Sequence, residues 1–333
     1  MLSLWTVAPA LFVFSAVLCG GYRRLAVARQ WVDVPNHRSS HVQVVPRGAG
    51  IVFALLIGLA AVLAVVAGEP AGLAAGVLCG VGIAVAGWWD DLRGVPALWR
   101  FCLYWVISVT AIALMVWPMP EGPRIQLLLM LLAYSVALQW LINLYNFMDG
   151  INGIAAAEAI FALCAMLVLG PKADGITWLS VCSIAALCGF LLWNFPIARV
   201  FMGDAGSAFL GFLLGLMVIW SGLRDSSDVL VWLILLGVFI VDATYTLLVR
   251  MLTGQEWLQG HRLHAYQILA RNLGSHARVV GAVFLVNVFW LLPWAWVARE
   301  RWLDPLLALV LAYLPLVLVC CVTRAGNLSP TRV

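Results

Sequence analysis

The sequence predicts an all-α polytopic membrane protein, and two observations carry that prediction. Hydrophobic residues make up 64% of the 333 residues and charged residues only 10%, with a mean hydropathy of +1.03. A soluble domain carries about a quarter charged residues, so this composition excludes a soluble globular protein. The apolar residues also form continuous runs rather than alternating with polar ones, which indicates membrane helices and not the strands of a barrel.

Each apolar run is long enough to cross a bilayer as a helix. A span needs roughly 20 residues to cross the hydrocarbon core, and eleven runs of about this length occur. We therefore expect about 11 transmembrane helices, over residues 3–22, 49–67, 72–89, 99–117, 125–142, 153–170, 177–193, 206–221, 229–249, 278–298 and 305–323.

The distribution of basic residues predicts the orientation, because cytoplasmic loops are enriched in Lys and Arg. With a periplasmic N-terminus and a cytoplasmic C-terminus, the inside segments and the C-terminal tail hold 14 of the 19 Lys and Arg residues. We expect residues 1–333 to form a single integral membrane domain, with cytoplasmic loops at 23–48, 90–100, 143–152, 194–205 and 250–278.

Three acidic motifs lie at the ends of apolar runs, all on the predicted cytoplasmic face. They are Asp90-Asp91 in WWDDLRG, Asp149 in NLYNFMDGING and Asp204 in FMGDAGS. A carboxylate beside hydrocarbon is costly, and its presence there marks a functional site. Carboxylate oxygens, together with substrate phosphates, are the ligands that Mg²⁺ takes in proteins. The motifs therefore predict a magnesium and phosphate site at one membrane surface.

The Asp90-Asp91 pair by itself has a second interpretation, as charges that mark a helix end at the water boundary. Two adjacent aspartates repel, and each raises the pKa of the other unless a cation is close. Arg93, Arg100 or a bound Mg²⁺ could supply that positive charge.

Polar side chains recur every three residues around Asp149. Asn143, Asn146 and Asn152 share this spacing, which places them along one face of a helix. Hydrogen bonding between helices is an alternative role for such asparagines. The acid at the point where the helix breaks favours a lining that holds phosphate or sugar hydroxyls together with metal-bound water.

The FMGDAGS motif opens the eighth apolar run. Gly203 and Gly206 permit a tight turn and the close approach of a ligand. Asp204 and Ser207 could act simply as caps of the helix that follows. The presence of the other acidic motifs favours a metal-ligand role for Asp204.

A histidine motif lies in the longest predicted inside loop. His261 and His264 flank Arg262, and this arrangement suits a pyrophosphate, because arginine forks onto oxygens and histidine donates a hydrogen bond. A zinc site would need further ligands nearby, and only His276 is available. Anion binding is therefore the favoured interpretation.

Loop 23–48 is basic and turn-rich, with Arg38 and Arg47 as candidate anion-binding residues. An ordinary positively charged inside loop is the alternative. Asp242 lies near the inner end of its apolar run and could join the polar site.

In this order, the motifs resemble those of the polyprenyl-phosphate N-acetylhexosamine-1-phosphate transferases, the membrane glycosyl transferase family 4. The resemblance runs from about Val34 to Gln267, with FMGDAGSAFLG as its most specific part. It implies transfer of a UDP-activated N-acetylhexosamine 1-phosphate to undecaprenyl phosphate, with release of UMP. It also implies a place in the cytoplasmic membrane of a bacterium, with the active site on the cytoplasmic face.

The resemblance further implies a role for each motif. Asp204, with Asp91 beside it, would hold Mg²⁺, and Mn²⁺ is an alternative ion. Asp90 would act as a base toward the lipid phosphate or as a nucleophile, and Asp149 would lie at the reacting centre. The implied catalytic residues are thus Asp90, Asp91 and Asp149, and the implied substrate-binding residues are Asn143, Asn146, His261, Arg262, His264, Arg38 and Arg47.

Details of the motifs separate the branches of this family. The histidine motif lacks the triple histidine of the branch that handles muramyl-pentapeptide precursors. It resembles the HRxHAYQ loop of the branch that starts O-antigen chains. Initiation of O-antigen and lipopolysaccharide synthesis is therefore the expected role, and the peptidoglycan transferase is the alternative.

A membrane transporter is a hypothesis from another class, because acids within a membrane also mark ion paths. A transporter places polar groups near mid-membrane and often has repeated halves, whereas here they collect at one face. The donor sugar stays open among N-acetylglucosamine, N-acetylfucosamine and N-acetylquinovosamine. Oligomeric state, including a homodimer, is open too, and no nucleic-acid partner is expected.

Overall fold

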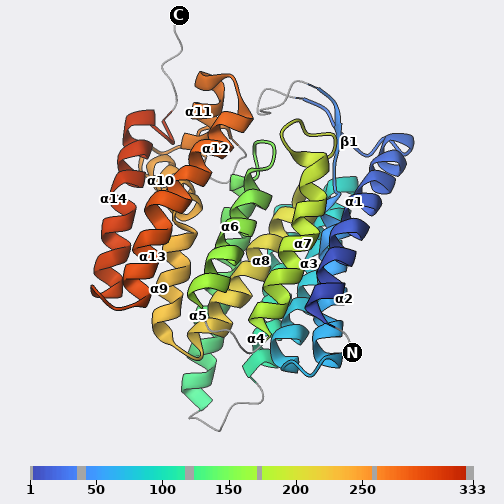
Figure 1. The fold of residues 1–333 in the computed structure, drawn as a ribbon. Coiled ribbons are helices and arrows are strands. Elements are labelled where there is room, and N and C mark those ends of the chain that lie inside the picture. The colour runs from blue at the N-terminus through green and yellow to red at the C-terminus, as the bar shows by residue number, and fades with distance from the viewer. Residues whose placement is uncertain (1–2, 36–42, 117–123, 171–174, 257–260, 328–333) are drawn as a thin grey trace, which may run out of the picture.

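The protein is a bundle of long helices (Figure 1). This computed structural model describes residues 3–35, 43–116, 124–170, 175–256 and 261–327. Their elements are α1 (Leu4–Ala28), β1 (Val32–Asp33), β2 (Val45–Pro46), α2 (Gly50–Val66), α3 (Ala71–Arg93), α4 (Ala97–Val116), α5 (Arg124–Met148), α6 (Ile154–Leu169), α7 (Ile176–Asn194), α8 (Gly203–Gly222), α9 (Ser226–Leu235), α10 (Gly237–Leu252), α11 (Ala265–Leu273), α12 (His276–Val286), η1 (Asn287–Leu291), α13 (Leu292–Arg299) and α14 (Pro305–Thr323).

Every predicted apolar run contains a helix, but the predicted number of 11 spans is wrong. Among the described residues, eight helices are long and apolar enough to cross a membrane, or nine if the pair α9 and α10 is one span. Helices α2 and α6 have only 17 and 16 residues. At about 1.5 Å per residue they are shorter than the ~30 Å of hydrocarbon. The run predicted at 229–249 is divided by a bend of 77° between α9 and α10.

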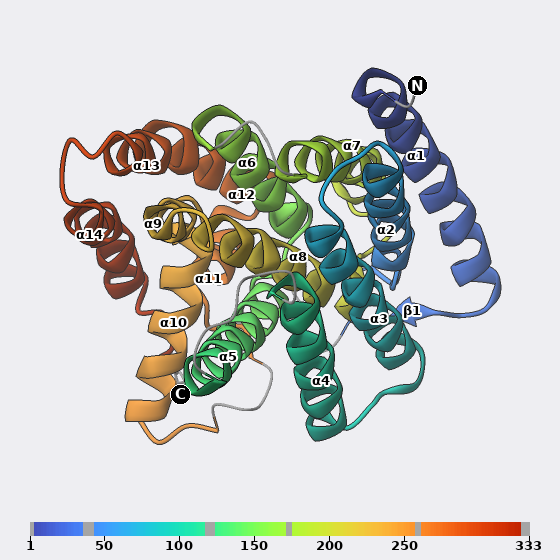
Figure 2. The same ribbon diagram turned by 90° about the horizontal axis from the view of Figure 1, so that it is seen from below.

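Helix α8 lies at the centre of the bundle (Figure 2). It packs against α2, α3, α5 and α9, and every residue from Ala205 to Ser221 is buried. A helix that is apolar on all sides is typical of a core position. Because α8 begins at Gly203, it carries Asp204 in its first turn. Asp204 therefore lies on the central helix, at one end of the bundle.

Glycine lets α8 approach its neighbours at that end. A Cβ on Gly50 would lie 2.2 Å from the backbone of Gly206, so the first turns of α2 and α8 touch through their backbones. Gly203 has a φ of +68°, in the left-handed region that glycine enters without strain. The tight turn and close approach expected from this motif are present, although the approaching group is protein rather than ligand.

A short antiparallel hairpin of β1 and β2 is attached to the segment before α8. Val32 pairs with Pro46, the N–H of Phe201 donates to the Pro46 carbonyl at 2.8 Å, and the N–H of Ala49 donates to the Phe201 carbonyl at 3.0 Å. In Figure 1 the hairpin and α11 lie at the same end of the bundle, opposite the N-terminus. The β1–β2 hairpin and the start of α8, which carries Asp204, therefore lie at the same end.

Candidate active site

Two of the predicted aspartates share one arginine. The guanidinium of Arg100, in the first turn of α4, contacts the carboxylate of Asp90 at the end of α3 and that of Asp204 at the start of α8. Three helices thus contribute one charged group each to a single cluster. In the sequence Arg100 is one of several possible sources of positive charge, and the structure places it between the two acids.

Asp91 contacts the backbone instead. Its side chain is buried, and its two oxygens accept the N–H groups of Asp204 at 3.1 Å and Ala205 at 3.2 Å. The first N–H groups of a helix have no partner within the helix, and α8 has no side-chain cap of its own. Asp91 therefore caps α8 from α3. Its predicted catalytic and metal-binding roles remain predictions.

The asparagines predicted to share one helix face have different surroundings in the structure. The side chain of Asn146 hydrogen-bonds the carboxyl group of Asp204, so it belongs to the acidic cluster. The amide of Asn143 is instead exposed and donates to the carbonyl of Gln139 on its own helix, at 2.7 Å. A shift of three residues is enough to turn one amide toward Asp204 and leave the other outside.

Asp149 follows the last residue of α5 and joins the cluster electrostatically. Burial raises the pKa of the Asp149 carboxyl well above its ordinary value, and the negative charges of Asp204 and Asp91 raise it further. A nearby cation would favour the charged form. The three acidic motifs, far apart in the sequence, thus form one region with excess negative charge.

The histidine motif lies at the start of α11. His264 is buried with its Nδ1 3.3 Å from Oδ1 of Asp242, and the ring of His261 stacks on it with centroids 4.8 Å apart. Arg262 is exposed, and its backbone carbonyl accepts a hydrogen bond from Arg271 at 2.9 Å. Of the three predicted pyrophosphate ligands, His264 has a structural partner, and His261 and Arg262 are more accessible.

Asp242 repeats the capping role of Asp91. Its two oxygens accept the N–H groups of Ala265 and Tyr266, each at 2.9 Å, so α10 caps α11. The hydroxyl of Tyr266 then donates to the carbonyl of Phe147 at 2.9 Å, two residues before Asp149. Tyr266 was not singled out from the sequence, because a tyrosine beside an apolar segment carries no signal of its own.

Of the two arginines predicted to bind anions in the first loop, only Arg47 belongs to the described residues. Arg38 lies outside the described residues. The chain at Arg47 is held through its backbone, with its N–H donating to Trp31 at 3.1 Å and its carbonyl accepting the Tyr22 hydroxyl at 2.8 Å. The positive charge of Arg47 lies within electrostatic reach of Asp91. Arg47 is thus at the edge of the acidic cluster.

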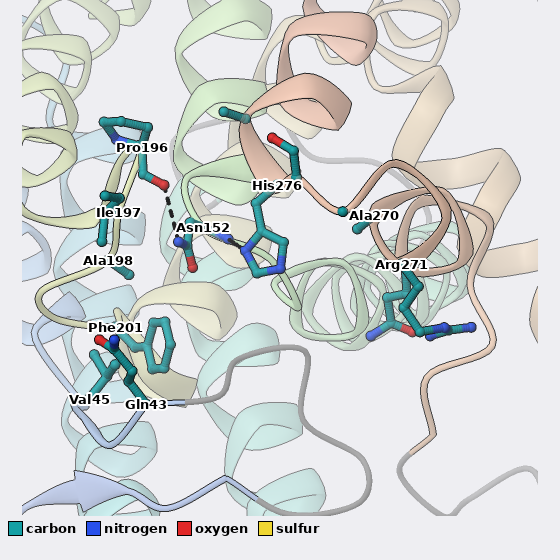
Figure 3. A pocket seen from close by; sticks show the side chains of 14 residues that line it. Gln43, Val45, Asn152, Pro196, Ile197, Ala198, Phe201, Ala270, Arg271 and His276 are labelled. Carbon is teal, nitrogen blue, oxygen red and sulfur yellow. Dashed lines mark hydrogen bonds between the residues drawn. The ribbon is translucent and has the colours of Figure 1, made fainter.

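A cavity of about 500 Å³ lies between the segment before α8 and the segment that joins α11 to α12 (Figure 3). Phe201 and Asn152 line it, each three residues from a predicted site aspartate. The N–H of Asn152 donates to Nδ1 of His276 at 3.4 Å, and its side chain donates to the carbonyl of Pro196 at 3.1 Å. The cavity is also lined by Gln43, Val45, Ile197, Ala198, Gln267, Ala270, Arg271 and Ser275.

The oxygen donors at this site suit Mg²⁺, but they do not form a complete cage. No group of three or more His, Cys, Asp or Glu side chains is arranged to hold a metal ion in the part of the chain that the structure describes. Carboxylate oxygens and water are the preferred ligands of Mg²⁺. Asp204 and Asp149 supply carboxylates, and the negative charges of Asp204 and Asp91 act on the Asp149 carboxyl. The chemistry of the residues therefore fits a divalent cation.

Comparison with known proteins finds a match to the family model "Glycosyl transferase family 4" over residues 73–222. A probable undecaprenyl-phosphate N-acetylglucosaminyl 1-phosphate transferase of Bacillus subtilis is 28% identical over 278 residues, covering 80% of this chain and 76% of that protein. A decaprenyl-phosphate N-acetylglucosaminephosphotransferase of Mycolicibacterium smegmatis is 29% identical over 309 residues, covering 80% and 75%.

A more local similarity links the chain to another kind of enzyme. A phospho-N-acetylmuramoyl-pentapeptide-transferase of Chlamydia trachomatis is 38% identical over 98 residues, which is 27% of this chain and 29% of that protein.

Proposed function

We propose that this protein, a prenyl-phosphate sugar-1-phosphate transferase by its homology to glycosyl transferase family 4, transfers N-acetylglucosamine 1-phosphate from its UDP derivative to undecaprenyl phosphate. The observation that carries the proposal is the convergence of Asp90, Asp204 and Arg100 at one end of the bundle. A cavity lined by Phe201, three residues before Asp204, lies near them. Charged groups of both signs at a membrane surface suit a reaction between two phosphates, one of them on a lipid.

In the proposed reaction, an oxygen of the lipid phosphate forms a bond to the β-phosphorus of the donor. The bond between that phosphorus and the bridging oxygen breaks, and UMP leaves with the electron pair. Such reactions depend mainly on alignment and charge neutralisation. Arg100 would bind the phosphate oxygens, and Asp90 would accept the proton of a monoprotonated lipid phosphate.

The donor would occupy the cavity beside α11. A uracil ring could stack on Phe201 and hydrogen-bond at Asn152, while its pyrophosphate extends toward Asp204 and the accessible His261 and Arg262. Mg²⁺, held by Asp204 and Asp149, would neutralise the charge that develops on the phosphates. Nucleotide sugars are made in the cytosol, so this end of the bundle would face the cytoplasm, with the protein in a bacterial cytoplasmic membrane.

A role in starting O-antigen or lipopolysaccharide synthesis is part of the proposal. It is supported by the HRLHAYQ sequence, which lacks three successive histidines. The peptidoglycan transferase remains the second candidate, since the local similarity to the Chlamydia trachomatis enzyme reaches 38% identity. Donor choice separates the two, because only the second would use a muramyl-pentapeptide nucleotide.

The test is release of UMP by the purified full chain with undecaprenyl phosphate, Mg²⁺ or Mn²⁺, and a panel of UDP-N-acetyl sugars that includes the muramyl-pentapeptide donor. Asp204→Asn removes the negative charge at the same volume, and we expect it to lower kcat by about 100-fold or more. Asp304→Asn is a matched control at the other end of the bundle, where Asp304 caps α14 and asparagine caps equally well.

The expected result is UMP release that requires lipid phosphate and metal, with Asp304→Asn behaving as wild type. Correctly folded protein that releases UMP from none of the donors in the panel would contradict the proposal. So would an Asp204→Asn variant that retains full activity.

A further inference from the structure

One buried hydroxyl beneath the acidic cluster has no partner. Tyr104, on α4, is only 6% exposed, and its hydroxyl makes no hydrogen bond with any residue that the structure describes. Buried tyrosine hydroxyls usually find a partner. The group is therefore either bridged by water or reserved for a ligand.

Tyr104 lies one helical turn beyond Arg100. Residues four apart on a helix share a face, and long helical side chains lean toward the helix N-terminus, which for α4 is the end that carries Arg100. The charged groups that act on Tyr104 are Asp204, Arg100 and Asp90, followed by Asp91. The hydroxyl thus lies near the acidic cluster, one helical turn further into α4 than Arg100.

A second buried polar atom without a partner lies across the α4–α5 contact. Gln139 is 4% exposed, and its Nε2 donates to the carbonyl of Phe101 at 3.4 Å, one turn before Tyr104. Its Oε1 has no partner among the described residues. A structural water could bridge Tyr104 and Gln139, since buried waters join such groups. That arrangement would leave substrate binding independent of Tyr104.

We propose that the Tyr104 hydroxyl donates a hydrogen bond to a phosphate oxygen of the prenyl-phosphate acceptor, an inference that rests on the proposed function. The acceptor is favoured over the nucleotide because Tyr104 lies one turn further into the apolar helix α4 than Arg100, toward the hydrocarbon that a prenyl chain would occupy. The nucleotide cavity is lined from the loops instead, by Asn152 and Phe201 among others. A phosphate oxygen between Arg100 and Tyr104 would accept from both, and hydrogen bonds to a charged acceptor are the strong ones.

The experiment is steady-state kinetics of Tyr104→Phe in the full chain, with undecaprenyl phosphate and the UDP-sugar varied in turn. The substitution removes only the hydroxyl oxygen. We expect KM for the lipid to rise by about tenfold or more and KM for the UDP-sugar to stay within about twofold. Tyr134→Phe is the matched control, because Tyr134 lies twelve residues before Asn146 on α5, about 18 Å along the helix. It should behave as wild type.

The proposal is overturned if Tyr104→Phe leaves KM for the lipid unchanged or raises KM for both substrates by the same factor. A lowered melting temperature with unchanged KM values would identify the water bridge to Gln139. Binding of undecaprenyl phosphate in detergent, measured by titration calorimetry without any donor, separates this proposal from the proposed function. If wild type releases no UMP but Tyr104→Phe weakens lipid binding, the transferase proposal alone fails. If binding is equal in both proteins, the role of Tyr104 fails.

Discussion

Two aspartates in this protein act as caps for helices that they do not belong to. Asp91 uses both oxygens on the first N–H groups of α8, and Asp242 does the same for α11. Aspartate near a helix N-terminus also interacts favourably with the helix dipole. The arrangement fixes the direction of α8 just where Asp204 must face Arg100, so a residue expected to take part in chemistry also determines the geometry of the site.

Replacing Asp91 by alanine should therefore destabilise the protein as well as inactivate it. Two buried N–H groups would lose their acceptor, and each unsatisfied group costs about 1–3 kcal/mol. Asp91→Asn retains one acceptor, the amide oxygen, and should therefore lose less stability. The measurement is the thermal unfolding midpoint in detergent, followed beside UMP release. An Asp91→Ala variant that is inactive but unfolds at the wild-type temperature would contradict the capping role.

At the scale of elements, α11 is a short helix held at two points. Asp242 binds its N-terminus from α10, and Tyr266 attaches it to the end of α5 beside Asp149. A Cβ on Gly150 would lie 2.2 Å from the Tyr266 hydroxyl, so the turn after Asp149 fits closely under this helix. Helix α11 thereby connects the bent α10, the histidine motif and the cavity to the turn that carries Asp149.

Tyr266→Phe should loosen this attachment. The loss of one hydrogen bond costs about 1 kcal/mol of folding stability, and we expect KM for the UDP-sugar to rise because the cavity wall moves with α11. Tyr313→Phe is the matched control, since its hydroxyl donates to the carbonyl of Leu233 at 2.7 Å, away from the cavity. The measurements are KM for the UDP-sugar and the thermal unfolding midpoint of both variants. Equal KM values in the two variants would show that α11 does not shape the donor site.

For the whole molecule, charge is concentrated at the two ends of the bundle. Opposite the candidate site, Arg299 on α13 contacts Asp228 on α9 and lies 3.9 Å from Asp225, while Arg301 lies 3.6 Å from Asp225. Asp225 also accepts the N–H and the hydroxyl of Ser227, at 2.9 Å and 2.7 Å. These contacts tie α9 to α13, and none of them adjoins the acidic cluster.

The end opposite the site should give the fold a specific sensitivity to acid. Hydrogen bonds from Ser227 lower the pKa of the Asp225 carboxyl. Because this pKa is lower in the folded protein than in the unfolded chain, the carboxylate stabilises the fold above about pH 4. That contribution is lost as the pH falls further, through the folded pKa. Asp225→Asn should flatten the pH dependence of the unfolding midpoint between about pH 2 and 5, with no effect on UMP release at neutral pH. An unchanged acid profile would contradict the assignment.

The apolar runs predicted the positions of the helices other than α11, because continuous hydrophobicity is a local property of the chain. Helix α11 lies in the predicted loop 250–278. The runs overestimated the number of spans, because α2 and α6 are too short and the bend after Leu235 divides one run. Of the residues that the motifs singled out, the structure brings together Asp90, Asp204 and Asn146. The motifs did not separate Asn146 from Asn143, since the difference depends on how α5 is rotated about its axis.

The sequence by itself determined that this is a helical membrane protein with acidic groups at the ends of its apolar runs, because both properties follow from composition and spacing. Only the tertiary structure decided which acid faces Arg100 and which caps a helix. Asp91 caps a turn that is 113 residues away, and Tyr104 approaches Asp204 from another helix. Contacts of this kind depend on the rotation and packing of whole helices, which no local pattern of residues encodes.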